Sequence, residues 1–328
     1  MRPTAAFAQK GLSLIELMVA MLLALILIGG VVQIFLSSRL TYSTTSALSA
    51  VQESGRFASE FLAFDIRNAA YKGECLAPIN NLTGLTDARF TLDLGLEGWD
   101  NSETSLPTWF DADDRLEGTD IILLKHAVNS SGAVVNTGET VAPDDTEITL
   151  AQASGIPTGT VLVASDPIGC DIFLNQSANT DSAVSRETSG TFSHDYADDL
   201  EILSYQSAVY FIKAGAAGEV PSLWRIRYNN GSAGMAAEQM VEGVQDMQIQ
   251  YAVGDANLAI TGDYVDADDI TDWSKVVSAR FSLLVVSRDA NVVAQNQVIS
   301  FNGADVTIEN RRLAQVFTST VGIRNRLP

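Results

Sequence analysis

The sequence is poor in basic residues and contains only two histidines. Its 20 lysines and arginines are outnumbered by 40 aspartates and glutamates, so the formal net charge is −20. Such a charge repels phosphate backbones and bare anionic lipid, and we therefore expect no direct binding of nucleic acid. His126 and His194 lie far apart in the sequence, and two histidines without further donors do not make a zinc site.

Catalytic motifs are also lacking. The sequence contains neither the G-x-S-x-G turn of hydrolases nor the G-x-x-x-x-G-K-[ST] phosphate loop. We therefore predict no catalytic residues, no cofactor and no resident metal, and the chain is not expected to be an enzyme. With 328 residues, of which 46% are hydrophobic, it is long enough for a substantial core and one or two domains.

Two acidic segments supply oxygen ligands of the kind that calcium prefers. Their members are Asp111, Asp113, Asp114, Glu117 and Asp120 in the first segment, and Asp263, Asp266, Asp268 and Asp269 in the second. Neither segment has the spacing of an EF-hand loop. We predict solvated loops and helix caps, with Asp269 or Thr271 capping the turn that follows, and keep a calcium site as the alternative.

A long apolar run is present near the N-terminus. From Leu17 to Leu36 only Gln33 is strongly polar, and a span of about 20 apolar residues matches the thickness of a bilayer core. Arg2 and Lys10 precede the run, which places the first residues in the cytoplasm by the positive-inside tendency. A secretory signal would be shorter and would end in a small-residue cleavage site.

One carboxylate, Glu16, lies near the start of this run, and no other charged residue follows until Arg39. A carboxylate within a membrane helix costs roughly 2.5 to 3.5 kcal/mol on insertion scales, so it is normally retained for a partner. The alternative is a carboxylate at a helix N-terminus, favoured by the helix dipole and close enough to the interface to stay hydrated.

The stretch QKGLSLIELMVA, residues 9–20, resembles the class III signal of type IV prepilins. The resemblance implies cleavage after Gly11 by a prepilin peptidase, and N-methylation of the new N-terminal residue, Leu12. It also implies that Glu16 is the residue needed for assembly, where its carboxylate neutralises the amine of its own or a neighbouring subunit. Leu12 departs from the phenylalanine that is most common in that family.

Further blocks resemble the PilW family of type IV pilus minor pilins. They are GVVQIFLSSRLTY, QESGRFASEFLAFDIRNAAYKGEC, VEGVQDMQIQYAV, YVDADDITDWSKVVSARFSLLV and RRLAQVFTSTVGIRNR. The resemblance implies a minor pilin that initiates assembly near the tip of a filament, for which twitching motility, cell adhesion and DNA uptake are open alternatives. The implied partners are the other minor pilins, the major pilin, the prepilin peptidase, the inner-membrane assembly platform and a PilY-type tip adhesin. Residues from about 80 to 200 carry no such motif.

The expected fold is α+β, with a long N-terminal helix packed on a head rich in antiparallel sheet. We expect a leader at 1–11, a membrane-spanning helix at 12–36, an amphipathic periplasmic helix at 37–71, and a head at 72–328 with a loop-rich insertion around 80–200. Strands are predicted in TDIILLKHAV, GTVLVAS, CDIFL, SAVYFIKA, LWRIRYN, MQIQYAV and ARFSLLVVS. The resulting localisation is a single-pass inner-membrane protein with a periplasmic head, which later enters an extracellular pilus.

In the amphipathic helix, the apolar residues recur at spacings of three and four and predict a core-facing stripe. They are Leu48, Val51, Phe57, Phe61, Leu62 and Phe64. Gly29, Gly30 and Gly55 are predicted weak points where this helix bends or melts locally.

Cys75 and Cys170 are the only cysteines. In an oxidising compartment we expect them to form one disulfide that fastens the insertion to the helix base, with two buried free cysteines as the alternative. The C-terminal arginines Arg311, Arg312, Arg324 and Arg326 are expected to pair with carboxylates of the same head or with an acidic neighbouring subunit.

Two alternative functions are open. A type II secretion pseudopilin shares the leader and the Glu16 argument. A single-pass periplasmic receptor or binding module would use the apolar helix only as an anchor, and would show no cleavage after Gly11.

Overall fold

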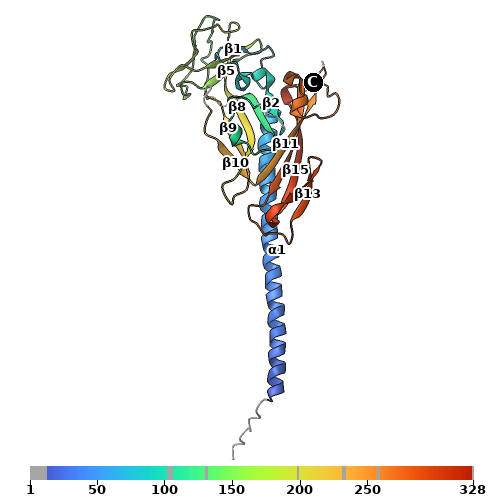
Figure 1. The fold of residues 1–328 in the computed structure, drawn as a ribbon. Helices are drawn as coiled ribbons and strands as arrows, with labels where there is room; N and C mark the ends of the chain where they lie inside the picture. The colour runs from blue at the N-terminus through green and yellow to red at the C-terminus, as the bar shows by residue number, and fades with distance from the viewer. Residues whose placement is uncertain are drawn as a thin grey trace, which may run out of the picture.

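The computed structural model describes residues 13–101, 106–129, 132–197, 199–230, 234–255, 257 and 259–326. Its first element is α1 (Leu14–Asn68), a single helix of 55 residues. The lower half of α1 projects from the head as a free rod, while the upper half lies within the head (Figure 1). The helix continues through Gly29, Gly30 and Gly55, so the local melting predicted at these glycines does not occur.

The larger sheet has eight strands. They are β1 (Asn80–Asn81), β2 (Leu96–Trp99), β3 (Ile121–Val128), β5 (Val161–Ser165), β6 (Cys170–Leu174), β8 (Glu201–Lys213), β9 (Ser222–Arg227) and β10 (Glu238–Glu242). The order is β1-β6-β5-β8-β3-β2, and β9 joins β8 and carries β10. All pairs are antiparallel except β1 with β6. The long strand β8 therefore organises this sheet, because it pairs with β5, β3 and β9.

A second sheet is built from the C-terminal third of the chain. Its strands are β11 (Val244–Val253), β12 (Val276–Val286) and β15 (Ala314–Gly322), in the order β11-β12-β15 and all antiparallel. Two small pairs complete the strands: β13 (Gln297–Phe301) with β14 (Ala304–Ile308), and β4 (Glu147–Thr149) with β7 (Ala183–Ser185). All seven predicted strand segments are strands, and the predicted α+β class is confirmed.

Short 3-10 helices connect the strands. They are η1 (Ala88–Phe90), η2 (Leu92–Leu94), η3 (Ala112–Asp114), η4 (Ala267–Asp269), η5 (Trp273–Lys275), η6 (Glu309–Arg311) and η7 (Arg324–Arg326).

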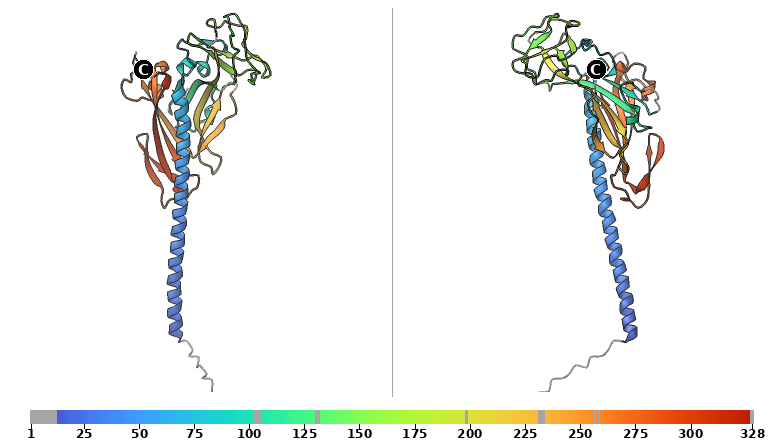
Figure 2. Two further views of the ribbon diagram at one scale, coloured as in Figure 1. Left: turned by 180° about the vertical axis from the view of Figure 1, so that it is seen from behind. Right: turned by 60° about the vertical axis from the view of Figure 1, so that its left-hand side comes forward.

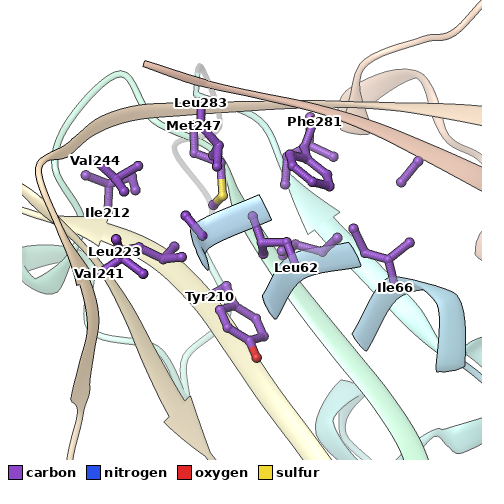
Figure 3. Packing of buried hydrophobic residues seen from close by; sticks show 14 of the residues in the cluster. Leu62, Ile66, Tyr210, Ile212, Leu223, Val241, Val244, Met247, Phe281 and Leu283 are labelled. Carbon is purple, nitrogen blue, oxygen red and sulfur yellow. The ribbon is translucent and has the colours of Figure 1, made fainter. Parts of the chain in front are cut away.

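The main core lies where the upper half of α1 meets both sheets. Leu62 and Ile66 of α1 are fully buried, and Tyr210 of β8, Met247 of β11 and Phe281 of β12 belong to the same cluster (Figure 3). Burying a side chain of this kind contributes about 1.5–3 kcal/mol. The helix is therefore a structural element of the head along this half, whereas the other half has no such contacts (Figure 2).

The segment from about 80 to 200 does not form a separate loop-rich insertion throughout. It supplies β3, β5 and β6 to the larger sheet. A smaller lobe with its own core surrounds β4 and β7, and Ile148, Phe173 and Tyr196 are among its buried residues. The segment from about 80 to 200 therefore belongs partly to the larger sheet and partly to this lobe.

Candidate assembly site

The exposed half of α1 is apolar on all sides. Between Leu14 and Leu36 the large apolar side chains are 49% to 78% exposed, with Val32 lowest and Leu14 highest. Among the described residues, α1 is the one helix that is long and apolar enough to cross a membrane, with a mean hydropathy of 2.7 over its most apolar window. Exposure of such an apolar surface to water is unfavourable, so we expect lipid or other apolar helices to cover it.

Glu16 closes the N-terminal end of α1 through a capping box with Ser13. The Ser13 hydroxyl oxygen accepts the Glu16 backbone N–H at 3.2 Å, and the Ser13 backbone N–H donates to Glu16 Oε2 at 3.0 Å. The Ser13 hydroxyl also donates to the same Glu16 oxygen at 3.1 Å. The carboxylate is thus held at the positive end of the helix, the local arrangement described by the alternative interpretation of Glu16.

The processing residues Gly11 and Leu12 lie outside the described residues. Cleavage after Gly11 would place a free amine on Leu12, directly before Ser13 and four residues before Glu16 in the sequence. The Glu16 carboxylate itself is folded back toward Ser13. The attraction between a carboxylate and an amine is strong in an apolar surrounding.

The head holds α1 through small and medium side chains. The buried positions of the helix are Ala47, Val51, Gly55, Ala58, Leu62 and Ile66. The stripe predicted from the aromatic residues is therefore wrong in its rotation about the helix axis. Phe57 and Phe61 are each 39% exposed and Phe64 is 57% exposed.

Two contacts at this junction were not predicted. The Phe317 ring of β15 packs directly over Gly55, where no side chain separates it from the helix backbone. Asp65 accepts a hydrogen bond from the Tyr210 hydroxyl at 2.6 Å and lies 3.3 Å from His126 Nε2. Burial, together with the Asp65 carboxylate, raises the pKa of Tyr210 and keeps it a donor. The sequence feature that points to the contact with Phe317 is Gly55 itself, a glycine within the predicted helix.

Two of the exposed phenylalanines border a pocket between α1 and the larger sheet, with a volume of about 470 Å³. Phe61 and Phe64 form its helix side, and Val128 and Ala208 lie on the sheet side. Phe57, Phe61 and Phe64 together define an exposed aromatic face of α1 within the head.

Cys75 and Cys170 form a disulfide with a Cα–Cα distance of 5.8 Å. Both residues are buried. Cys75 follows the end of α1, and Cys170 is the first residue of β6 in the larger sheet. The bond therefore ties the chain that leaves the helix to the sheet, across a separation of 95 residues.

The acidic segments supply caps and one buried residue. Asp111 caps η3 by accepting the Asp113 N–H at 3.1 Å. The cap of η5 is Asp272 and not the predicted Asp269 or Thr271, because the Asp272 carboxylate accepts the Ser274 N–H. Asp120 is only 4% exposed and is therefore not part of a solvated loop.

No metal centre is formed by the side chains that the structure describes, since no group of three or more His, Cys, Asp or Glu residues is arranged to hold an ion. The two histidines are separated into different environments. His126 lies beside Asp65, and His194 Nε2 lies 2.8 Å from Asp166 Oδ2 in the smaller lobe.

Three of the four C-terminal arginines, Arg311, Arg312 and Arg326, bind backbone and amide oxygens instead of the predicted carboxylates of the head, and Arg324 is exposed. Arg326 donates to four carbonyl oxygens, those of Asp93, Leu94, Trp273 and Val276. Its burial lowers its pKa to about 10. Arg312 donates to the Ser287 and Arg288 carbonyls, and Arg311 to the Asn291 side chain. These residues fix the C-terminal end of the chain within its own head.

Two family matches agree with this architecture. Residues 7–32 match the prokaryotic N-terminal methylation motif. Residues 209–325, which contain the C-terminal sheet, match type IV pilus-assembly protein W. No curated protein and no solved structure matches the chain.

A methylation motif on an exposed apolar helix, followed by a head rich in antiparallel sheet, defines the class as a pilin-like protein related to type IV pili. The particular resemblance is to the PilW family, and the resemblance seen in the sequence is confirmed by the match over 209–325. That family consists of pilus assembly components and is not a known enzyme family.

Proposed function

We propose that this chain is a minor pilin of the type IV pilus that helps to initiate assembly and is incorporated at or near the filament tip. The observation that carries the proposal is the combination of a fully exposed apolar half-helix with a PilW-type head on the same α1. After removal of the leader, the apolar half would leave the inner membrane and bury against the helices of neighbouring pilins.

The proposed mechanism is helix packing with charge compensation. In the membrane, the cytoplasmic end of α1 lies near the interface, and Ser13 supplies donors to the Glu16 carboxylate. In a helix bundle that excludes water, the same carboxylate would be costly without a positive partner. The amine released on Leu12, or that of a neighbouring subunit, is the partner that cleavage after Gly11 creates.

The position at the tip rests on the head. A head with two sheets and an additional lobe is more easily accommodated at an end than within a close-packed shaft. The aromatic face of α1 offers a second apolar contact above the half-helix, suited to the helix of an adjacent pilin. Other minor pilins, the major pilin and a PilY-type adhesin are the proposed partners.

The test is complementation of a deletion strain with Glu16→Ala. We expect normal cleavage and membrane insertion but a loss of surface pili, because the carboxylate is needed only when helices pack. Glu53→Ala is the matched control, since Glu53 is an exposed carboxylate on the same helix within the head. Glu16→Gln removes the negative charge but keeps an acceptor oxygen, so it shows whether assembly needs the charge or only the hydrogen bonds. Normal piliation by Glu16→Ala would contradict the assembly role.

A type II secretion pseudopilin predicts the same result for processing but a secretion defect without a pilus defect. An anchored periplasmic receptor predicts no cleavage and tolerance of Glu16→Ala. The readouts of cleavage, piliation and secretion together therefore distinguish the three functions.

A further inference from the structure

Asp120 joins the two sheets of the head. It directly precedes β3 of the larger sheet, and its partners lie in β11 of the C-terminal sheet. The Asp120 backbone N–H donates to the Met247 carbonyl at 2.9 Å. The Ile249 backbone N–H donates to Asp120 Oδ2 at 2.6 Å. One residue thus uses both its backbone and its side chain to hold the sheets together.

The other carboxyl oxygen of Asp120 has no donor. Asp120 Oδ1 makes no hydrogen bond in the described part of the chain. The residue is only 4% exposed, so water does not replace the missing donor. A buried carboxylate oxygen without a donor is strongly destabilising, because it has lost its water and gained nothing in return. Asp100, which follows β2, lies within hydrogen-bonding reach of this side chain.

The nearest donor is the Asn101 backbone N–H, which lies beside both carboxylates and donates to Asp100 Oδ1 at 2.7 Å. Tyr251 approaches from β11, where burial first, and then the charges of Asp120 and Asp100, raise its pKa. Asp246, also in β11, is half-buried and accepts from the Gln248 amide at 2.8 Å. Arg115 approaches from the connection before β3, and its Nη1 donates to the carbonyl oxygens of Asp100 and Thr119 at 3.2 and 3.3 Å. Burial first, and then the neighbouring Asp100, raise the pKa of Asp120 to about 8.

We propose that Asp100 and Asp120 share one proton, so that an acid–carboxylate hydrogen bond forms part of the joint between the two sheets. The proton satisfies the otherwise unpartnered oxygen and removes one of two adjacent negative charges. A metal ion is the less suitable occupant, because the described residues offer no third acidic, histidine or cysteine ligand here. The joint therefore weakens when the proton is lost.

The expected pH dependence follows from linkage. An unfolded aspartate has a pKa of about 3.9, so below about pH 4 both states hold the proton and the stability contributed by the pair is complete. As pH rises the folded chain still holds the proton while the unfolded chain does not, and the contribution declines until it is lost above about pH 8. In this window the effect on the folding equilibrium constant is about tenfold per pH unit.

The experiment compares the full-length chain, in detergent and with its disulfide intact, with the variant Asp120→Asn. An asparagine at this position accepts the Ile249 N–H and donates to Asp100 at every pH. The ratio of the folding equilibrium constants, variant over wild type, should rise about tenfold per pH unit from about pH 5 and level off near pH 8. Asp305→Asn, an exposed aspartate in β14, is the control and should leave the ratio constant.

A ratio for Asp120→Asn that does not change over this range would overturn the proposal. If the variant does not fold, infrared spectroscopy of the wild-type chain provides the second measurement. A carboxylic-acid C=O stretch should be present at neutral pH and disappear at alkaline pH. Absence of this band at neutral pH, or its loss on addition of calcium together with a higher melting temperature, would also refute the shared proton.

Discussion

At the scale of single residues, Gly55 determines how closely the head approaches α1. It is a buried helical glycine, and a Cβ atom placed on it would lie 2.2 Å from the Phe317 ring. Such a contact is far inside van der Waals distance, so a larger residue would have to displace β15 from the helix. The conformational cost of a glycine in a helix is therefore offset by packing.

Gly55→Ala should destabilise the head by about 1–3 kcal/mol through overpacking, even though alanine is favoured over glycine in a helix by about 1 kcal/mol. Gly29→Ala is the matched control, because no atom lies within 4 Å of its added Cβ. Denaturant unfolding of the detergent-solubilised full-length chain, followed by tryptophan fluorescence, measures both variants. An unchanged or higher stability for Gly55→Ala would show that Phe317 yields without cost.

The same region shows what the sequence could not specify about residues. The spacing of apolar residues identified the helix correctly, but the phenylalanines lie outside the buried face and the small residues lie within it. The spacing of apolar residues predicts that one side of the helix is apolar. Which side of the helix faces the core depends on how closely the sheets approach it. At Ala47, Gly55 and Ala58 the helix is buried against the head, and a close approach requires small side chains. A hydropathy pattern favours large apolar residues and does not identify such positions.

At the scale of elements, the disulfide between Cys75 and Cys170 connects the end of α1 to β6. The loop it closes contains β1 to β5, so the bond restricts a large part of the unfolded chain. Replacing both cysteines with alanine should lower the free energy of unfolding by about 4–5 kcal/mol in the chain-entropy model.

The measurement is unfolding of the wild-type chain with and without reductant, beside the double alanine variant. Reductant should destabilise the wild type and leave the variant unchanged. Alkylation without prior reduction should add no mass to protein isolated from the periplasm. Two alkylated cysteines in that sample would contradict a disulfide in the native protein.

The strands were predictable as elements, but their arrangement was not. Apolar runs such as CDIFL and the alternation in MQIQYAV carry a local signal for strands. The order of the larger sheet depends on pairings between distant segments, for example β8 with β5, β3 and β9. Such pairings are decided by tertiary contacts, and a stretch without a known motif gives no indication of them.

At the scale of the whole molecule, the chain has a net charge of −20 and combines an apolar half-helix with an acidic head. The apolar half carries no charged residue between Glu16 and Arg39. The two parts require different surroundings, which a membrane or a filament provides at once. The prepilin-type motif could be identified from the sequence because its residues are contiguous, whereas the joint at Asp120 depends on residues brought together only by folding.

The measurement that tests the central claim most directly is the N-terminal sequence and mass of the protein recovered from sheared filaments. The account predicts a chain that begins with N-methylated Leu12 and lacks residues 1–11. It also predicts that this form is found in the filament fraction and depends on the prepilin peptidase. A protein that retains residues 1–11 and is found only in the inner membrane would contradict the account.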